Sequence, residues 1–263
     1  SGTASKAAVP SLIDSVLDKE LFEYEKAWDV RKAAFIPMIA EQRPTVIGVQ
    51  EARPPQLKWL EDNWKDYAYI GKGRRNNNSN TDEFVPIFYR KKAVELIDWG
   101  CFWLSETPDV AASQGWDSTV PRVATWAVFK HLASGKKFFF INTHIDVGSK
   151  VAPVKSMEVI ISKMSELNPE NLPMLLTADF NKQIDSDIFD GVKKFMTNVR
   201  LSAPVTDSKH SYTGFGTATP YIVDHIFCTG FKPLKFETID KVYEKITYIS
   251  DHYPIVGKLE YVK

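Results

Sequence analysis

The sequence contains few cysteines and histidines, and its formal net charge is zero. The two cysteines, Cys101 and Cys228, lie far apart without metal-ligand spacing, so they neither require nor exclude an oxidising compartment. Lys plus Arg and Asp plus Glu both number 33, so no global positive field supports indiscriminate nucleic-acid binding. A phosphate-bearing partner would need a local basic patch. Lys72 to Arg75 and Lys136 with Lys137 are the candidates, although such runs are commonly solvated faces.

Long apolar runs and linkers are also missing. No apolar run is long enough to cross a bilayer, and the first residues, SGTASKAAVPS, lack the charged and apolar regions of a signal peptide. Because a signal peptide can be removed beforehand, the compartment stays open, and we favour a periplasmic or secreted location over the cytoplasm. No Pro/Gly/Ser-rich linker interrupts the chain, so we expect one domain over residues 1–263, and a monomer.

What is present is a hydrophobic content of 44%, enough for a substantial core, distributed over alternating helix and strand patterns. Helices are predicted over 29–42 with a kink at Pro37, from Pro54 onwards, over 154–167, and near 184–195. The predicted strands are 45–50, 84–90, 93–104, 122–131, 136–144, 173–179, 221–228, 233–239 and 253–261. Several of these strands are apolar throughout, which indicates an α/β or α+β fold of sheets covered by helices.

Ionisable and amide side chains lie where the predicted strands end. They are Glu51, His144, Asp179 with Asn181, and Asp251 with His252 ahead of the last strand, while Asp224 lies inside the segment YIVDHIF. Because ligands of layered sheets gather at strand ends, the conjunction predicts one site.

Each of these residues also has an ordinary structural interpretation. Glu51 could cap the following helix or form a surface salt bridge, and His144 could be a hydrogen-bonded structural histidine. Asp179 and Asn181 could both form turns. Asp251 could also form a turn, with its neighbour His252 facing solvent. Asp224 fits such an interpretation least, because an acid between apolar neighbours is buried and needs a partner.

A set of motifs in a fixed order resembles the endonuclease/exonuclease/phosphatase superfamily, and especially its bacterial branch with FWLSETP and GWD signatures. The motifs are VIGVQE (46–51), IFYR (87–90), FWLSETP (102–108), GWDS with Arg122 (115–122), NTHID (142–146), ADFN (178–181), VDHIF (223–227) and ISDHYPIV (249–256). The resemblance implies a four-layer α/β/β/α sandwich of two mixed sheets covered by helices. It also implies hydrolysis of phosphoesters by a metal-assisted, in-line attack of water.

The resemblance also implies a role for each site residue. Glu51 binds Mg²⁺ or Mn²⁺, with Asp251 contributing directly or through water, and Asp179 orients or deprotonates the attacking water. Asn181 donates hydrogen bonds to the phosphate oxygens, and His144 stabilises the charge that develops on them. His252, paired with Asp224, contacts the scissile phosphate. The distant cysteines and few histidines also argue against a zinc site.

Three departures from the family pattern concern the metal and substrate contacts. Family members open with a strand of the type TYN, whose asparagine helps hold the metal, whereas residues 1–27 here form an atypical segment without asparagine. Asp14 or Asp18 are the candidates to replace it. The family motif Gly-Asp-x-Asn begins with Ala178 here and keeps both of its polar residues, Asp179 and Asn181. Pro153 stands where members of the bacterial branch usually have a basic residue.

Three functions are compared from these observations. The leading one is a metal-dependent phosphoesterase, whose partner is a phosphoester substrate. Phosphodiesters, including nucleic acid, are the leading substrate class, and small or lipid-derived phosphoesters are the alternative. Arg122 resembles a family residue that reaches the site, and Trp116, Phe215 and Tyr212 are candidates for a substrate wall, although such residues also serve as strand salt bridges or packing. The second is a non-catalytic phospholigand-binding module with a degraded metal site, and the third, a glycosidase, fits poorly because it has no use for Asn181.

Overall fold

A computed structural model of the protein describes residues 27–263, which divide into two compact units. The larger unit comprises Pro44–Thr206, Val223–Phe236 and Gly257–Lys263, and the smaller one comprises residues 27–43, Asp207–Ile222 and Glu237–Val256. The atypical segment predicted over residues 1–27, with Asp14 and Asp18, lies outside the described residues except for Ala27. That the whole chain is one domain stays a prediction.

A six-stranded mixed sheet forms the centre of the larger unit, with strand order β4-β5-β6-β7-β9-β8. Only β6 and β7 are parallel, and helix α5 connects them, as a parallel crossover requires. The elements are β4 Val94–Trp103, β5 Val123–His131, β6 Lys137–His144, α5 Ala152–Leu167, β7 Met174–Asp179, β8 Thr197–Asn198 and β9 Asp224–Thr229. Six consecutive residues of β6 are buried, which explains why this strand is apolar on both faces.

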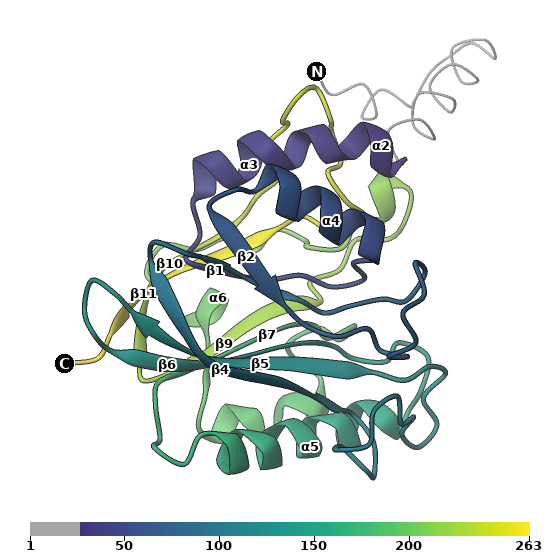
Figure 1. The fold of residues 1–263 in the computed structure, drawn as a ribbon, viewed down its shortest axis with the longest axis vertical. Helices are drawn as coiled ribbons and strands as arrows, with labels where there is room; N and C mark the ends of the chain where they lie inside the picture. Colours follow the sequence, from purple (N-terminus) through teal and green to yellow (C-terminus); the bar gives the residue numbers. More distant parts are fainter. Residues whose placement is uncertain (1–26) are drawn as a thin grey trace. The chain divides into compact units, whose positions relative to one another are not determined.

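Helix α5 covers one face of this sheet (Figure 1). Its buried residues Met157, Ile160 and Met164 pack against the apolar side chains of β6 and β7. The helix begins at Ala152 with Pro153 in its first turn. Proline is tolerated there because the N–H groups of the first turn have no acceptor within the helix. Its cap comes from a distant residue: the carboxylate of Asp117 accepts the backbone N–H groups of residues 150, 151 and 152 at 2.8–3.1 Å.

A three-stranded antiparallel sheet packs on the other face, with order β1-β3-β2. Its strands are β1 Val46–Gly48, β2 Tyr67–Ile70 and β3 Ile87–Arg90, and Ile70 and Ile87 join Phe129 and Phe140 in one apolar cluster. Helix α4, Pro54–Asn63, covers this small sheet, and the Trp64 that follows it packs edge-on against Phe88. The four layers of helix, sheet, sheet and helix confirm the predicted sandwich (Figure 1). The strands β10 Phe231–Thr238 and β11 Ile255–Tyr261 pair in a separate two-stranded sheet.

The smaller unit begins with an interrupted helix, and the interruption lies three to five residues before the kink predicted at Pro37. Helix α2, Trp28–Arg31, continues through a 3-10 turn, Lys32–Ala34, into α3, Phe35–Gln42. The interruption directly precedes the turn that contains Pro37, because proline lacks an N–H and crowds the carbonyl four residues before it. Arg43 ends the helix in a left-handed conformation with φ of 42°.

Two predictions of local structure were wrong, and three elements were not predicted. The helix predicted near 184–195 is two short 3-10 turns, Asp187–Phe189 and Val192–Lys194, because its apolar residues pack into the core from a segment broken at Gly191. Strand β2, the short helix α6 at Val199–Ser202 and the two-residue strand β8 were not predicted. Asp224 is the first residue of β9 and not an interior one. Cys228 is buried in β9. Among the described helices, none has the length and hydropathy of a membrane span.

Candidate active site

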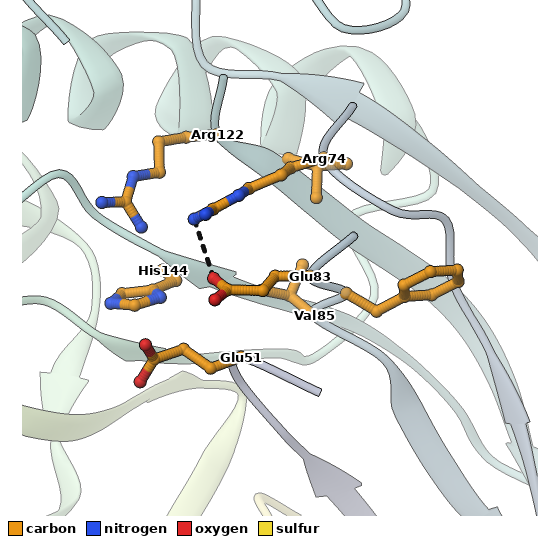
Figure 2. Close-up of a pocket in the computed structure, with 8 residues that line it drawn as sticks. Glu51, Arg74, Glu83, Val85, Arg122 and His144 are labelled. Atoms are coloured by element: carbon orange, nitrogen blue, oxygen red, sulfur yellow. Dashed lines mark ion pairs between the residues drawn. The ribbon is translucent and has the colours of Figure 1, made fainter. Parts of the chain in front are cut away.

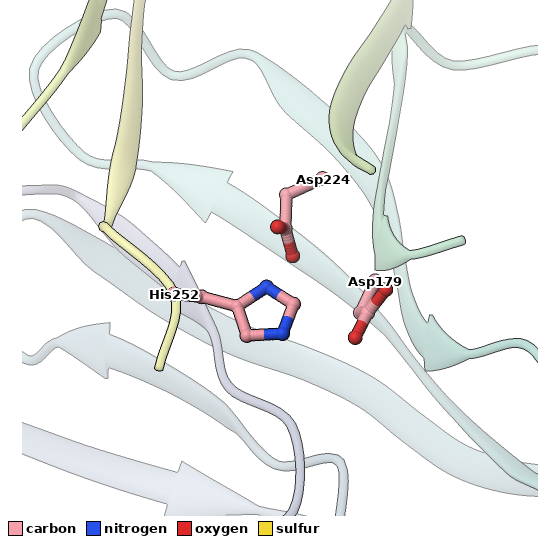
Figure 3. A group of neighbouring side chains, drawn as sticks. All are labelled: Asp179, Asp224 and His252. Atoms are coloured by element: carbon pink, nitrogen blue, oxygen red, sulfur yellow. The ribbon is translucent and has the colours of Figure 1, made fainter. Parts of the chain in front are cut away.

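Three predicted site residues form one row across the edge of the large sheet. His144 ends β6 and is the register partner of Asp179, which ends β7. Asp179 is in turn the partner of Asp224, because β9 runs antiparallel to β7 and starts where β7 ends. Asp179 and Asp224 are both buried, and Figure 3 shows them on the neighbouring ends of these strands. The sheet register therefore brings together side chains that are 80 residues apart in the sequence.

The turn after β7 places Asn181 beside this row. Oδ1 of Asp179 accepts the backbone N–H of Asn181 at 2.9 Å, so the predicted turn role of Asp179 is confirmed. Its other oxygen, Oδ2, lies 3.3 Å from Nε2 of His144. The amide Nδ2 of Asn181 lies 3.3 Å from the same Nε2 and donates to the carbonyl of Ile145 at 2.8 Å. Asp179 thus shapes the turn and also contacts His144.

A pocket of about 200 Å³ opens beside His144 (Figure 2). Its polar lining consists of Glu51, Arg74, Glu83, Arg122 and His144, with apolar contributions from Phe84, Val85 and Val123. Arg74 pairs with Glu83 at 2.8 Å. Glu51 follows β1 and has an exposed side chain and a left-handed backbone with φ of 60°, so it does not cap α4, whose first turn Arg53 and Gln56 close.

Arg122 enters the pocket from the residue before β5, and the buried Asp146 holds it. Its Nε and Nη2 donate to Oδ1 of Asp146 at 3.2 and 3.1 Å, and Ser149 donates to Oδ2 at 2.6 Å. Burial alone would raise the pKa of Asp146, but the hydrogen bond from Ser149 and the charge of Arg122 outweigh it and lower that pKa. Arg122 therefore combines the salt-bridge role with a place in the pocket lining.

Asn142 is a structural residue of the site that the sequence did not reveal. It is fully buried, and its Nδ2 donates to the carbonyls of Val49 and Pro86 at 2.8 and 3.0 Å. Its Oδ1 accepts from Gln50 and Thr177 at 2.8 and 3.0 Å. The bonds to Val49, Pro86 and Gln50 join the two sheets and fix the segment that presents Glu51, whereas the bond from Thr177 lies within the large sheet. Polar residues within an apolar strand give no sequence signal of this role.

The GWD signature positions Trp116 at the surface of a fixed loop. Trp116 has a φ of 46°, which is unusual for a bulky residue, and its backbone N–H donates to Glu106 at 3.2 Å. The next residue, Asp117, caps α5, and Thr119 donates to Asp146 at 3.3 Å. No role was predicted for Asp117 or Asp146, because Ala152 and Arg122, which they contact, are distant from them in the chain.

The smaller unit carries the remaining four predicted residues, Tyr212, Phe215, Asp251 and His252. The carbonyl of Asp251 accepts the N–H groups of Thr213 and Gly214 at 2.9 and 3.1 Å, and its Oδ1 accepts from Ser250 at 3.1 Å. The rings of His252 and Tyr212 lie tilted against each other, with centroids 5.1 Å apart. Phe215 is in a left-handed conformation with φ of 57°.

Phe215 also contacts a cation of the smaller unit. The guanidinium of Arg31 lies 5.4 Å from its ring centroid and donates to the carbonyl of Ile249 at 2.6 Å. Burial lowers the pKa of Arg31, and the charge of Asp251 opposes this effect.

The pocket lining also indicates which metal would fit. The carboxylate of Glu51 offers hard oxygen ligands, and the lining drawn from the described residues contains no cysteine and a single histidine. Mg²⁺ and Mn²⁺ prefer such oxygen ligands, whereas a zinc site usually needs several nitrogen or sulfur ligands. Glu51 therefore offers the kind of ligand that a hard divalent cation prefers.

Carboxylates, a histidine and an amide at the strand ends of a four-layer α/β sandwich define a hydrolase-type site. Comparisons with solved structures agree with this class. An endonuclease/exonuclease/phosphatase from Bacteroides vulgatus is 32% identical with a TM-score of 0.83, and the alignment covers 89% of this chain and 92% of that one. A family member from Bacteroides thetaiotaomicron is 31% identical with a TM-score of 0.80, over 89% and 90% of the two chains.

A third solved structure is a mannosyl-6-phosphatase from Bacteroides thetaiotaomicron, which is 30% identical with a TM-score of 0.81 over 91% of this chain and 94% of that one. No protein-family model and no curated protein matches the sequence. The solved structures are sufficient to place the chain. It belongs to the endonuclease/exonuclease/phosphatase family, a family of phosphoesterases and nucleases.

Proposed function

We propose that this protein is a divalent-metal-dependent hydrolase of phosphoester bonds. The observation that carries the proposal is the row of His144, Asp179 and Asp224 at one sheet edge, with the amide of Asn181 beside it. A carboxylate, a histidine and an amide so close together can bind a phosphoryl group and a water molecule at once. A purely structural role for this row leaves the adjacent charged pocket unexplained.

The metal would be held by Glu51, with Asp251 contributing as the family resemblance implies. When bound, a divalent cation polarises the phosphoryl oxygens and offsets the negative charge that develops on them. Glu51 is suited to this role because its left-handed backbone and exposed carboxylate place it in the pocket lining.

The protein's own residues perform the hydrolytic step. Asp179 orients the attacking water and accepts its proton, while the new O–P bond forms opposite the bond that breaks. The leaving oxygen retains the electron pair of the broken bond. Asn181 donates an amide N–H to the phosphoryl oxygens, and His144, whose Nε2 lies 3.3 Å from Nδ2 of Asn181, stabilises the negative charge that develops on them.

His252 completes this proposal through its partnership with Asp224, which rests on the motifs VDHIF and ISDHYPIV. A carboxylate partner fixes the tautomer and orientation of a histidine and stabilises its protonated form. The change of His252 to Ala should therefore lower kcat by at least about 100-fold. His210→Ala is the matched control, because His210 is an exposed histidine of the same unit.

Arg122, Trp116 and Phe215 are proposed as substrate contacts. Arg122 supports the assignment by lining the pocket, and Trp116 supports it by a left-handed backbone that is unusual for a bulky residue. The substrate is a phosphoester, with phosphodiesters and nucleic acid as one class. The equal numbers of acidic and basic residues favour a substrate with few charges over a long polynucleotide.

The test is a panel of phosphoesters assayed with Mg²⁺, with Mn²⁺ and with EDTA. It contains a chromogenic phosphodiester, a phosphomonoester, plasmid and single-stranded DNA, RNA and a phospholipid. We expect turnover of one class that requires the metal and that Asp179→Asn abolishes. Asp185→Asn is the control, because it makes the same change at an exposed position six residues further along.

Thermal melting separates this enzyme from the non-catalytic binding module. A cation bound only by the folded protein raises Tm, by an amount that grows with its concentration. Turnover of no substrate, together with a Tm that Mg²⁺ and Mn²⁺ leave unchanged, would refute the proposed function and favour the binding module.

A phosphomonoesterase is the second candidate within the same chemistry. The similarity to a mannosyl-6-phosphatase over nearly the whole of both chains favours it. The monoester and diester arms of the panel distinguish the two candidates.

A further inference from the structure

Arg74 enters the pocket from a loop whose backbone is held on both sides. The backbone N–H of Arg74 donates to the carbonyl of Glu83 at 2.9 Å, and Nε1 of Trp103 donates to the carbonyl of Arg74 at 2.8 Å. The buried carboxylate of Asp82 accepts the N–H of Arg75 at 3.0 Å. This loop therefore fixes the origin of the Arg74 side chain and leaves Arg75 exposed.

The two guanidinium groups of the pocket use only part of their hydrogen-bonding capacity within the described residues. Nη1 of Arg74 pairs with Glu83 at 2.8 Å, and its Nε and Nη2 have no partner among residues 27–263. Nε and Nη2 of Arg122 bond Asp146, whereas its Nη1 has no partner in that range. Each guanidinium carries five N–H donors, so both retain donors for a ligand. Figure 2 shows both groups near His144.

Two positive charges in one pocket repel each other. Burial lowers the pKa of Arg74, the pair with Glu83 opposes this effect, and the charge of Arg122 lowers the pKa further. An anion bound between the two arginines would remove this repulsion. Oxygen atoms of a phosphoryl group match guanidinium geometry, which makes phosphate the natural ligand.

We propose that Arg74 and Arg122 together bind the phosphoryl group of the substrate and select a phosphomonoester dianion over a phosphodiester monoanion. Glu83 is a positioning residue that keeps Arg74 extended into the pocket. The selection follows from charge, because a monoester has two negative charges among three terminal oxygens, whereas a diester has one charge on two. This inference rests on the proposed phosphoester hydrolysis and adds the residue that determines the ester class.

The kinetic test compares two esters with the same leaving group, p-nitrophenyl phosphate and methyl p-nitrophenyl phosphate, at pH 8. We expect Arg74→Met to lower kcat/KM for the monoester by about 10–100-fold and for the diester by no more than about threefold. Arg74→Lys should fall between these values. Arg75→Met removes the same charge from an exposed position and should change neither ester by more than about threefold.

Two kinetic results would overturn the inference. Equal losses for both esters in Arg74→Met would show that Arg74 does not select charge. A loss in Arg75→Met as large as that in Arg74→Met would assign the effect to the general field of the loop. Circular dichroism and melting confirm that each variant is folded, and Arg74→Lys provides the comparison should Arg74→Met fail to fold.

A binding measurement judges the inference separately from hydrolysis. Titration calorimetry compares inorganic phosphate with dimethyl phosphate in the unchanged protein and in the Arg74 variants. We expect tighter binding of phosphate, and a loss of this preference in Arg74→Met. A protein that hydrolyses neither ester but shows this preference refutes the proposed function and retains the anion site. Equal binding of both ligands refutes the anion site.

Discussion

His225 provides a stability prediction that can be worked out from its surroundings. It follows Asp224 in β9, is 2% exposed, and lies 5.6 and 5.3 Å from the ring centroids of Phe180 and Phe189. Nε2 lies 2.9 Å from the carbonyl of Lys182, so this nitrogen carries the proton and donates it. Nδ1 is buried and has no hydrogen-bond partner among the described residues. The ring is therefore held in its neutral form.

Burial lowers the pKa of His225 from 6.5 to about 4. The hydrogen bond to Lys182 and the charge of Asp179 oppose this shift, whereas the charges of Arg200 and Lys193 reinforce it. Between pH 6.5 and pH 4 the unfolded chain binds a proton that the folded protein does not, so stability falls as the pH falls. At about 1.4 kcal/mol per pH unit, the shift corresponds to a loss of about 3 kcal/mol across this window.

The perturbation is His225→Phe, because a phenyl ring suits the aromatic surroundings and does not titrate. At pH 7 the variant should be less stable by about 1–3 kcal/mol, since the carbonyl of Lys182 loses its donor. Towards pH 4 this difference should disappear or reverse, because only the unchanged protein pays for keeping a histidine neutral. Urea unfolding followed by tryptophan fluorescence at several pH values measures both free energies of unfolding.

The comparison of the two proteins isolates His225 from all other titrating groups. A difference in stability that stays constant from pH 7 to pH 4 would contradict the reasoning. That result would mean that the folded protein accommodates the imidazolium ion, for example by letting water reach Nδ1.

Three further changes have definite expected results. Asp117→Ala removes the cap of α5 and should lower Tm by about 2–4 °C in a melting experiment. Gly48→Ala should lower the free energy of unfolding by about 1–3 kcal/mol in urea, because its Cβ would lie 2.4 Å from Oδ1 of Asn142. Glu51→Gln should abolish the rise of Tm with Mg²⁺ while leaving Tm in EDTA within about 2 °C, as measured by scanning fluorimetry, because the side chain is exposed.

The layered fold could be predicted because local pattern and burial agree. The apolar run of β6 is compatible only with a buried strand, and the amphipathic pattern of α5 only with a helix that covers a sheet. Both elements formed where expected. The segment 184–195 misled the prediction, because Ile188, Phe189 and Val192 have helical spacing but anchor two separate 3-10 turns in the core. Spacing alone does not distinguish a helix from turns that pack equally well.

The sequence predicted those residues of the site that lie at the ends of strands. His144 and Asp179 could be placed because parallel strands end at the same edge, and Asp224 joins them through the antiparallel start of β9. Asn142 and Asp146 were not assigned roles, because Val49 is 93 residues from Asn142 and Arg122 is 24 residues from Asp146, and no local signal marks such long-range hydrogen bonds. Pocket residues supplied by loops, such as Arg74, were likewise seen only as part of a basic run.

The left-handed backbone at Glu51 has a consequence for engineering this protein. A left-handed conformation disfavours any residue with a Cβ by about 1–2 kcal/mol, and glycine has no such penalty. Glu51→Gly should therefore raise thermal stability in EDTA while removing the proposed metal ligand. A library sorted only for heat resistance would enrich this inactive variant, so directed evolution of the protein needs catalytic turnover in every round of selection.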